Sequence, residues 1–476
     1  MSRAERAVAS KHIVITQSSS QEIEREGVYL LGSMVDGTYC LPSCHKRQAA
    51  LRSSLTMFPS ETMAKAAGLR ACKQCRPDRT HAHVGNGLRE FEELVHLMET
   101  APMSVPSVSA LAEHVALTME GLEVLLADHA HIPATEWLER MRVQAMARRL
   151  LDAGTVEGSA ASSAGFVNAD DGDQAFFRRM YMTPTEYQAL GQGQGFRIAL
   201  PEDYRAVEIL AYHGRDADGL SERTEGNRIF KALATPDGPA VMKITLHKTF
   251  ADVAASGPHK LGVTSFANLH RAALNVLGLR GDVQHFEARH PELSQDRRGL
   301  RLPLIPSAFD ALCWAIIGQQ INLSFAGSLR HSLILLAGEP VEDMRVHPTP
   351  AAVAALDPSE LTSRRFSRSK ANYLISVARA IDEGKLPIEE LINGSALAAE
   401  ALLTAQYGVG TWTARYVMMR TGFADAAPIG DSGLATALER MHALPLRPNA
   451  IATARLMARY APWRSLASAH LWATLL

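Results

Sequence analysis

The sequence lacks any apolar run long enough to cross a membrane, and its first residues lack the apolar core of a secretion signal. It also lacks an excess of charge of one sign, because 49 Lys and Arg nearly balance 50 Asp and Glu. These absences lead us to expect a cytoplasmic protein with no membrane partner. The balanced total is uninformative about other partners, since basic and acidic segments cancel.

Cysteine is scarce, with five residues in the chain. Four of them form two short-spaced pairs, Cys40-Leu-Pro-Ser-Cys44 and Cys72-Lys-Gln-Cys75, and Cys313 stands alone. So few cysteines are more consistent with a metal site in a reducing compartment than with a framework of disulfide bonds. Each short turn aims two thiolates at one point, as tetrahedral Zn²⁺ requires, and the alternative is four free core cysteines. We predict a zinc site at the pairs and a structural role for Cys313.

The chain is long enough for several domains, and its composition (47% hydrophobic, 21% charged) is that of a globular protein. Gly191-Gln-Gly-Gln-Gly195 indicates a flexible linker and the main boundary. Strand-like pieces then surround a helix near Phe266–Leu277, and helices dominate to the end. We expect a multidomain, mainly α protein: a small zinc α+β domain (27–82), a helical domain (86–190), an α+β subdomain (196–290) and an all-α domain (300–476).

The most informative stretch runs from Leu402 to Leu434 and indicates a helix, a tight turn, a second helix and a loop. The turn is Gly408-Val409-Gly410, where two glycines let the backbone bend sharply. Amides opening into the following helix make an anion site that a phosphate could occupy. Asp431 lies in the loop. The alternative is a plain helical hairpin with a surface aspartate.

This pattern resembles the helix-hairpin-helix DNA glycosylases, whose signature is a Gly-x-Gly hairpin followed by a Gly/Pro-rich loop and an aspartate. GLRLPLIPSAFDALCWAIIGQQ resembles the matching stretch of AlkA-type 3-methyladenine glycosylases, as do Phe366–Ala371 and Pro462–Trp472. In that family the turn at Gln319-Gln320-Ile321 contacts DNA and supplies a wedge that fills the gap left by an extruded base. Gln320, together with Ile321, is the candidate wedge here.

The resemblance implies excision of alkylated bases such as 3-methyladenine from damaged double-stranded DNA. Asp431 would stabilise positive charge on the sugar and orient water. Trp412 and Tyr416 are four residues apart on one face of a helix and would bind the base. Trp472 would join them if the last helix packs back against this helix. For each of the three aromatic residues, packing in the hydrophobic core is the alternative. Relatives that also nick DNA carry a lysine where this chain has Trp412, so we expect a monofunctional enzyme. No cysteine follows Cys313, which excludes the iron–sulfur cluster that some relatives carry.

The first half carries two further resemblances. GTYCLPSC…GLRACKQCRPD resembles the zinc domain of Ada methyl-transfer proteins, which implies that Cys40 accepts methyl groups from DNA phosphotriesters. Leu41 departs from the arginine usual in that family. Residues 86–190 resemble an AraC-type domain with two helix-turn-helix units. The segments that should enter the major groove are acidic, with Glu120 in one and Asp170 in the other, whereas such helices normally present Arg, Lys, Asn or Gln.

The chain as a whole therefore resembles a fusion of an Ada-type zinc and AraC-type module with an AlkA-type glycosylase. We expect a monomeric DNA-repair enzyme that uses Zn²⁺ in its first domain, with the N-terminal module binding DNA or sensing methyl damage. One alternative is a methylation-responsive transcription regulator whose glycosylase half is inert. Another is a protein that binds damaged or abasic DNA without catalysis.

Overall fold

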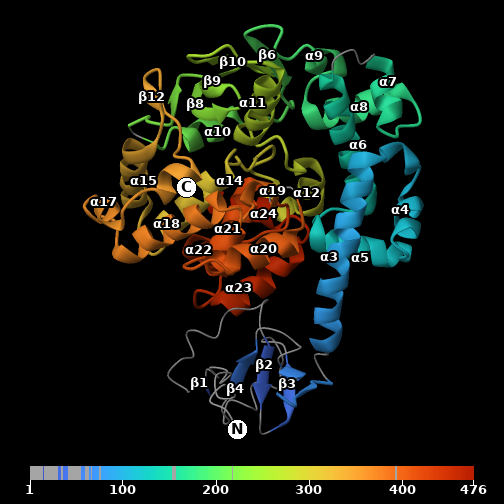
Figure 1. The fold of residues 1–476 in the computed structure, drawn as a ribbon, viewed down its shortest axis with the longest axis vertical. Helices are drawn as coiled ribbons and strands as arrows, with labels where there is room; N and C mark the ends of the chain where they lie inside the picture. Colours follow the sequence, from blue (N-terminus) through green and yellow to red (C-terminus); the bar gives the residue numbers. More distant parts are fainter. Residues whose placement is uncertain are drawn as a thin grey trace, which may run out of the picture. The chain divides into compact units, whose positions relative to one another are not determined.

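In a computed structural model the chain divides into two compact units, Met1–Glu90 and Phe91–Leu476 (Figure 1). Before residue 77 the structure describes residues 14–15, 30–33, 36–40, 55–58, 64–65 and 67–73. From residue 77 it describes all but 153–156, 217, 392–393 and 476. Within these described residues, no helix is both long enough and apolar enough to span a bilayer. The boundary between the units lies inside one helix, α3 (Pro77–Thr100).

The first unit holds a five-stranded sheet in the order β1-β4-β2-β3-β5. Its strands are β1 (Val14–Ile15), β2 (Leu30–Ser33), β3 (Thr38–Cys40), β4 (Leu55–Phe58) and β5 (Arg70–Ala71). Tyr39 of β3 and Leu69, which precedes β5, are buried and form a small core with Ala64. Strands β3 and β5 run parallel, with Tyr39 opposite Ala71, so the residues that follow each strand come side by side. This pairing sets the position of two of the cysteines.

The helical part that follows contains two groups of short helices joined by a long helix, called the first and second helix-turn-helix units below. Its elements are α4 (Val108–His114), α5 (Met119–His129), α6 (Ala134–Leu151), α7 (Glu157–Ser163), α8 (Ala169–Met180) and α9 (Pro184–Gln188). Side chains of Ser107, Thr118 and Asn168 cap α4, α5 and α8, which explains why these short helices begin where they do. The first helix-turn-helix unit has its own hydrophobic core, which includes Phe91 and Leu126.

The helices that would read DNA, α5 and α8, present acidic side chains to solvent. Glu120 and Glu123 are exposed on α5, and Asp170 and Asp171 on α8. The basic residues at the end of α8 are engaged elsewhere: Arg178 and Arg179 each pair with Glu139 of α6, at 2.9 and 3.0 Å. The acidic residues that the sequence analysis noted in these two helices are therefore exposed on their surfaces.

The α+β subdomain contains a sheet in the order β6-β10-β9-β8-β7, all antiparallel. Its elements are β6 (Gly195–Ala199), α10 (Ala206–His213), β7 (Glu222–Glu225), β8 (Arg228–Thr235), β9 (Gly238–Leu246), β10 (Phe250–Ser256) and α11 (Val263–Val276). One hydrophobic core joins this sheet and α11 to the second helix-turn-helix unit. Contrary to the expected main boundary at 191–195, that stretch connects two parts of one packed body, because a continuous core crosses it.

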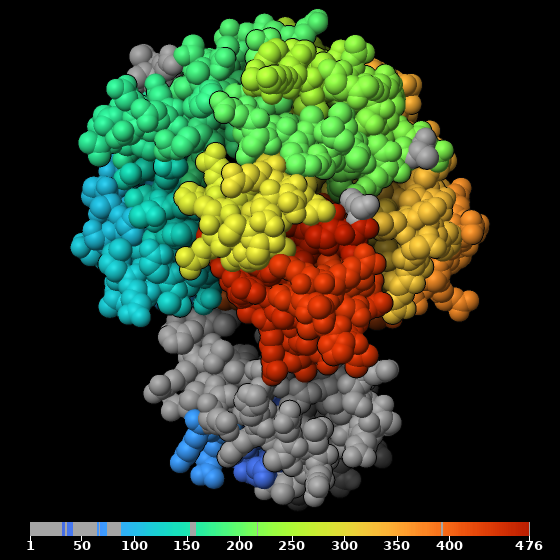
Figure 2. Space-filling model, turned by 180° about the vertical axis from the view of Figure 1, so that it is seen from behind, coloured from blue at the N-terminus to red at the C-terminus, as the bar shows by residue number. Residues whose placement is uncertain are grey.

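The C-terminal half is helical, and its helices surround the largest hydrophobic core among the residues that the structure describes. The elements are α12 (Val283–Arg289), α13 (Pro291–Ser294), α14 (Ala308–Gly318), α15 (Leu323–Ala337), β11 (Pro340–Val341), β12 (Met344–Arg345), α16 (Pro350–Ala354), α17 (Pro358–Thr362), α18 (Arg368–Asp382), α19 (Ile388–Leu391), α20 (Ala396–Thr404), α21 (Thr411–Thr421), α22 (Ser432–Met441), α23 (Ala450–Met457) and α24 (Arg464–Ala473). Cys313, the cysteine for which we predicted a structural role, lies fully buried in this core. In Figure 2 the yellow segment with α12 and α13 covers the junction between the green sheet region and the red C-terminal helices.

The first helix-turn-helix unit is anchored to the C-terminal helices at the end of α5. His129 Nδ1 lies 2.7 Å from the hydroxyl of Ser395, the residue that caps α20, and both side chains are buried. Beside it, His131 Nδ1 accepts a hydrogen bond from the backbone of Asp425 at 3.3 Å. Burial lowers the pKa of His131 to about 4, so the ring is neutral and free to accept at neutral pH. The helical part is thus fastened to the first helix of the predicted hairpin.

Candidate active site

The predicted hairpin is formed by α20, the turn at 408–410 and α21. Gly408 has φ +83°, and a Cβ placed there would lie 2.3 Å from the ring of Tyr373. Only glycine fits, because both the backbone conformation and the ring exclude a side chain. Val409 is buried and fixes the turn in the core. Gly410 caps α21 without any side-chain hydrogen bond, because glycine has no side chain to offer to the first-turn amides that are proposed to meet phosphate.

Replacing Gly408 by alanine should disrupt this turn. We expect Gly408→Ala to lower the free energy of unfolding of the C-terminal half by about 2–5 kcal/mol, because it combines a left-handed backbone with a clash against Tyr373. Gly410→Ala is the matched control, since a Cβ at Gly410 meets nothing within 4 Å. Thermal unfolding of both variants checks this; equal transition temperatures would contradict the packing argument.

The turn after α14 carries the residues predicted to contact DNA. Gln319 donates from Nε2 to the carbonyl of Gly408 at 3.0 Å and to the hydroxyl of Thr413 at 3.1 Å. Its amide therefore ties this turn to the hairpin, and a contact with DNA remains a prediction for it. Gln320 is exposed with φ +56°, and Ile321 is half-buried against the core. Gln320 is thus the most projecting of the three, as a wedge would have to be.

Asp431 caps the start of α22 and is half-buried. Its Oδ1 accepts hydrogen bonds from the backbone of Leu434 at 2.8 Å and from Trp472 Nε1 at 3.0 Å. The last helix therefore packs back onto the loop, as the sequence argument required. Gly433 makes room for this contact, because a Cβ there would lie 3.2 Å from Asp431 Oδ1 and 3.4 Å from the Trp472 ring. Helix capping and tryptophan together fix the orientation of the carboxylate.

The three predicted base-binding residues, Trp412, Tyr416 and Trp472, lie together and are called the aromatic cluster below. The rings of Trp412 and Tyr416 stack, with centroids 5.5 Å apart and an interplanar angle of 24°. Tyr416 and Trp472 are tilted at 6.5 Å. All three are half-buried, and Tyr416 and Trp472 pack against the core. Because Trp472 donates a hydrogen bond to Asp431, the electron-rich rings of the aromatic cluster lie next to the Asp431 carboxylate.

Sequence reasoning missed three residues that border the aromatic cluster: Trp314, Tyr212 and Arg420. Trp314 donates from Nε1 to the Tyr416 hydroxyl at 3.1 Å. The guanidinium carbon of Arg420 lies 4.9 Å from the ring centroid of Tyr212, 5.5 Å from that of Tyr416 and 5.7 Å from that of Trp472. Residues 412, 416 and 420 repeat every four positions, so the helix period could have revealed Arg420. Tyr212 comes from the α+β subdomain, and no local pattern points to it.

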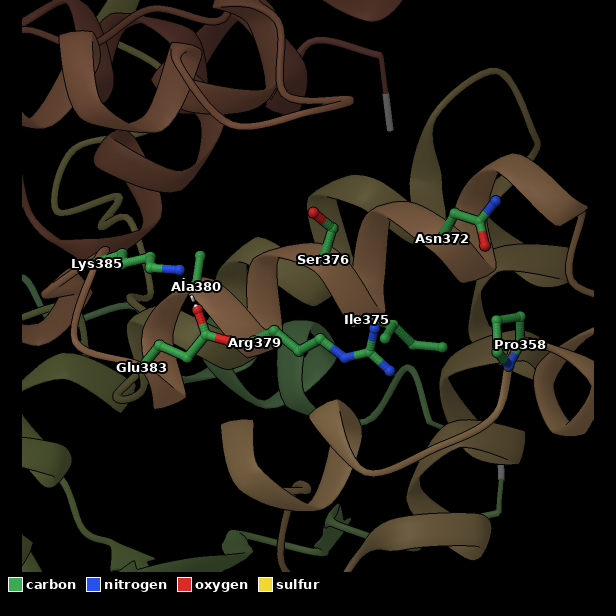
Figure 3. A pocket seen from close by; sticks show the side chains of 8 residues that line it. All are labelled: Pro358, Asn372, Ile375, Ser376, Arg379, Ala380, Glu383 and Lys385. Carbon is green, nitrogen blue, oxygen red and sulfur yellow. Dashed lines mark ion pairs between the residues drawn. The ribbon is translucent and has the colours of Figure 1, made fainter.

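A separate hollow of about 330 Å³ lies along α18 (Figure 3). It is lined by Pro358, Asn372, Ile375, Ser376, Arg379, Ala380, Glu383 and Lys385. Its charged groups are engaged with protein: Glu383 pairs with Lys385, and Arg379 donates to the carbonyl of Ala354 at 3.2 Å. It shares no residue with the aromatic cluster, so we do not assign base binding to it.

Two of the four predicted zinc ligands fall within the described residues. Cys40 ends β3 and Cys72 directly follows β5, and the backbone of Cys72 donates to the carbonyl of Tyr39 at 2.8 Å. Parallel pairing therefore brings these two cysteines to neighbouring strand ends, which fits a shared metal ion. Cys44 and Cys75 lie outside the described residues.

Comparison with known proteins agrees with this architecture. Residues 16–78 match the family described as the metal binding domain of Ada. Residues 313–462 match the family described as HhH-GPD superfamily base excision DNA repair protein. The first match contains all four paired cysteines, and the second contains the turn after α14, the hairpin and Asp431.

Individual relatives match over different lengths. The chain is 35% identical over 182 residues to a DNA-3-methyladenine glycosylase of Bacillus subtilis, covering 37% of this chain and 60% of the relative, which is less than two thirds of its length. It is 25% identical over 488 residues to a probable bifunctional transcriptional activator/DNA repair enzyme AlkA of Mycobacterium tuberculosis, covering 96% and 95%.

A third relative decides the family. The chain is 34% identical over 239 residues to DNA-3-methyladenine glycosylase 2 of Escherichia coli, covering 50% of this chain and 79% of that protein. The matched region of the family model contains the hairpin whose turn only glycine can form and the aspartate held by the last helix. On these grounds the chain belongs to the DNA-3-methyladenine glycosylases of the HhH-GPD base excision repair superfamily and carries an Ada-type metal-binding domain at its N-terminus.

Proposed function

We propose that this protein is a monofunctional glycosylase that hydrolyses the N-glycosidic bond of alkylated bases, such as 3-methyladenine, in double-stranded DNA. The observation that carries the proposal is the contact between Asp431 and Trp472, which joins a carboxylate to the aromatic cluster. Bases inside a duplex must be flipped out before their C1′–N bond can be reached. The exposed Gln320 would fill the vacated space, and the hairpin amides would hold a phosphate.

The chemistry requires stabilisation of charge at two places. Breaking the C1′–N bond builds positive charge on the sugar, and the Asp431 carboxylate stabilises that charge and orients the attacking water. An alkylated purine is itself cationic and leaves as a neutral molecule, so a strong general acid is dispensable. Stacking against Trp412, Tyr416 and Trp472 favours such a cation by about 0.5–2 kcal/mol for each good contact.

Base release tests the proposal. Purified full-length protein should release free 3-methyladenine from methylated duplex DNA and leave an abasic site in an intact strand, which chromatography of the bases and gel analysis of the DNA would detect. No release from methylated DNA would refute the proposed activity and favour the regulator or the binding-only alternative.

Trp412 makes a further prediction about mechanism. A bifunctional glycosylase uses a lysine amine to form a Schiff base, and the indole of Trp412 cannot. Sodium borohydride should therefore trap no covalent protein–DNA adduct during turnover. An adduct retained on a denaturing gel would show that another amine attacks the sugar and would overturn the assignment of a monofunctional enzyme.

The N-terminal module would add a second function. Zinc held by Cys40, Cys44, Cys72 and Cys75 would keep the sulfur of Cys40 deprotonated, which is the form that attacks a methylated phosphotriester. The placement of Cys40 beside Cys72 supports this. For the helix-turn-helix region we propose a mainly structural role, because the exposed faces of α5 and α8 are acidic and α5 is anchored to Ser395.

A further inference from the structure

Helix α5, which a DNA-reading helix-turn-helix domain would place in a groove, packs against α20 of the hairpin. The turn after α5 reaches the loop at 422–431, which connects α21 to α22 and ends at Asp431. In that turn the ring of His131 meets the ring of Phe423 edge-on, with centroids 5.8 Å apart. His131 Nδ1 also accepts a hydrogen bond from the backbone of Asp425 at 3.3 Å. The first helix-turn-helix unit thus contacts the loop that carries the candidate catalytic carboxylate.

His131 has a backbone conformation that surrounding contacts must hold. Its φ is +61°, in the left-handed region that residues with a side chain rarely adopt. Such residues persist where the structure around them fixes them, and they cluster at functional sites. Burial lowers the pKa of the ring to about 4, so Nδ1 carries no proton at neutral pH and can accept. The conformation and the protonation state of His131 therefore both suit the contact with the loop.

Contacts with two different elements hold this loop. The start of α24 holds it through Ser465, whose hydroxyl donates to the carbonyl of Phe423 at 2.6 Å. The helix-turn-helix unit holds it through His131, which accepts from the backbone of Asp425 and does not depend on the carboxylate of that residue. A partly buried amide needs such an acceptor, because leaving it unpaired is unfavourable. Loss of the imidazole would therefore loosen the loop, and Asp431 at its end would move with it.

We propose that the first helix-turn-helix unit contributes to catalysis by holding the 422–431 loop, and that His131 is the positioning residue for Asp431. The inference rests on the proposed glycosylase activity. A carboxylate stabilises charge on the sugar only from the right place, and a displacement of about 1 Å can slow a reaction on the order of a hundredfold. His131 fixes the loop before DNA binds and acts on the reaction only through it.

This role requires no contact between the helix-turn-helix unit and a DNA groove. The hydrogen bond of 2.7 Å between His129 and Ser395 fixes α5 to the start of α20, while Glu120 and Glu123 of α5 are exposed. An acidic helix that would repel DNA can therefore still support base release from within the protein. The unit lies outside residues 313–462, which match the HhH-GPD family, so this support is additional to the glycosylase fold.

Single-turnover release of 3-methyladenine by full-length variants tests the proposal. His131→Gly removes the imidazole and adopts the left-handed backbone without strain, so it should slow release at least about tenfold with unchanged affinity for abasic-site DNA. His131→Asn tolerates the same backbone and places its oxygen near the position of Nδ1, so it should stay within about threefold of the wild type. Ala116→Gly is the matched control, because Ala116 is an exposed residue of the same unit with φ +54°, and it should not change the rate.

His131→Gln keeps a side chain of full length but places its oxygen near the position of Nε2, so it should be as slow as His131→Gly. The asparagine and glutamine variants decide the question even if the glycine variant does not fold. Hydrogen exchange in a peptide covering 423–431 should be faster in the glycine and glutamine variants than in the wild type.

Wild-type rates in His131→Gly and His131→Gln, or an equally slow His131→Asn, would refute the positioning role and leave the proposed function intact. Slowing that is matched by an equal loss of DNA affinity would refute it too, because binding rather than the chemical step would then be affected. No release of 3-methyladenine by the wild type would instead refute the proposed function.

Discussion

Asp431→Asn should reduce the rate of base release by on the order of 10³-fold or more, because the amide cannot neutralise positive charge on the sugar. The structure makes this a clean substitution. Asparagine is as good a helix cap as aspartate, so its side-chain oxygen can still accept from Leu434 and from Trp472 Nε1. We therefore expect a folded variant with normal affinity for DNA that contains an abasic-site analogue.

The measurement is release of 3-methyladenine in single turnover, accompanied by a binding titration. Asp425→Asn is a suitable control carboxylate, since Asp425 pairs with Arg464 at 2.7 Å and contributes to packing near α24. It should affect stability more than the chemical step. An Asp431→Asn enzyme with wild-type rates would exclude Asp431 as the stabilising group.

Cys72→Ser should remove zinc from the protein and unfold the first domain while the glycosylase stays active. Structural zinc contributes about 10–16 kcal/mol to the folding of small domains, and the core around Tyr39 and Leu69 is too small to replace it. The second unit has its own cores and does not depend on that site. Zinc per chain should fall from near one to near zero by mass spectrometry.

Cys313→Ser provides the comparison for this experiment. Cys313 is fully buried in the glycosylase core, where burial raises the pKa of its thiol well above the usual value. Its replacement should destabilise the second unit and leave zinc content unchanged. A wild-type protein with far less than one zinc per chain would rule out the tetrathiolate site.

The regulator alternative depends on the helix-turn-helix region, and the structure adds to the argument against it. Acidic residues such as Glu120 and Asp170 are exposed on α5 and α8, and like charges repel DNA. The basic residues Arg178 and Arg179 are held by Glu139. The binding-only alternative is decided by base release alone.

Local features were accessible from the sequence because they depend on short-range geometry. Helix α14 (Ala308–Gly318) is an example, since apolar residues at helical spacing and the capping residue Ser307 define it locally. The stack of Trp412 on Tyr416 follows from a spacing of four in a helix. The pairing of cysteines and the Gly-x-Gly turn likewise require only neighbouring residues.

Contacts between distant segments were decided by tertiary structure. The hydrogen bond between Asp431 and Trp472, the Arg420 cation beside Tyr212, and the continuous core across residues 191–195 each join residues far apart in the chain. Burial and partner choice at such places depend on how whole elements pack, and no sequence period encodes that packing. The sequence therefore determined which residues could act, and the tertiary structure decided which of them meet and in what electrostatic surroundings.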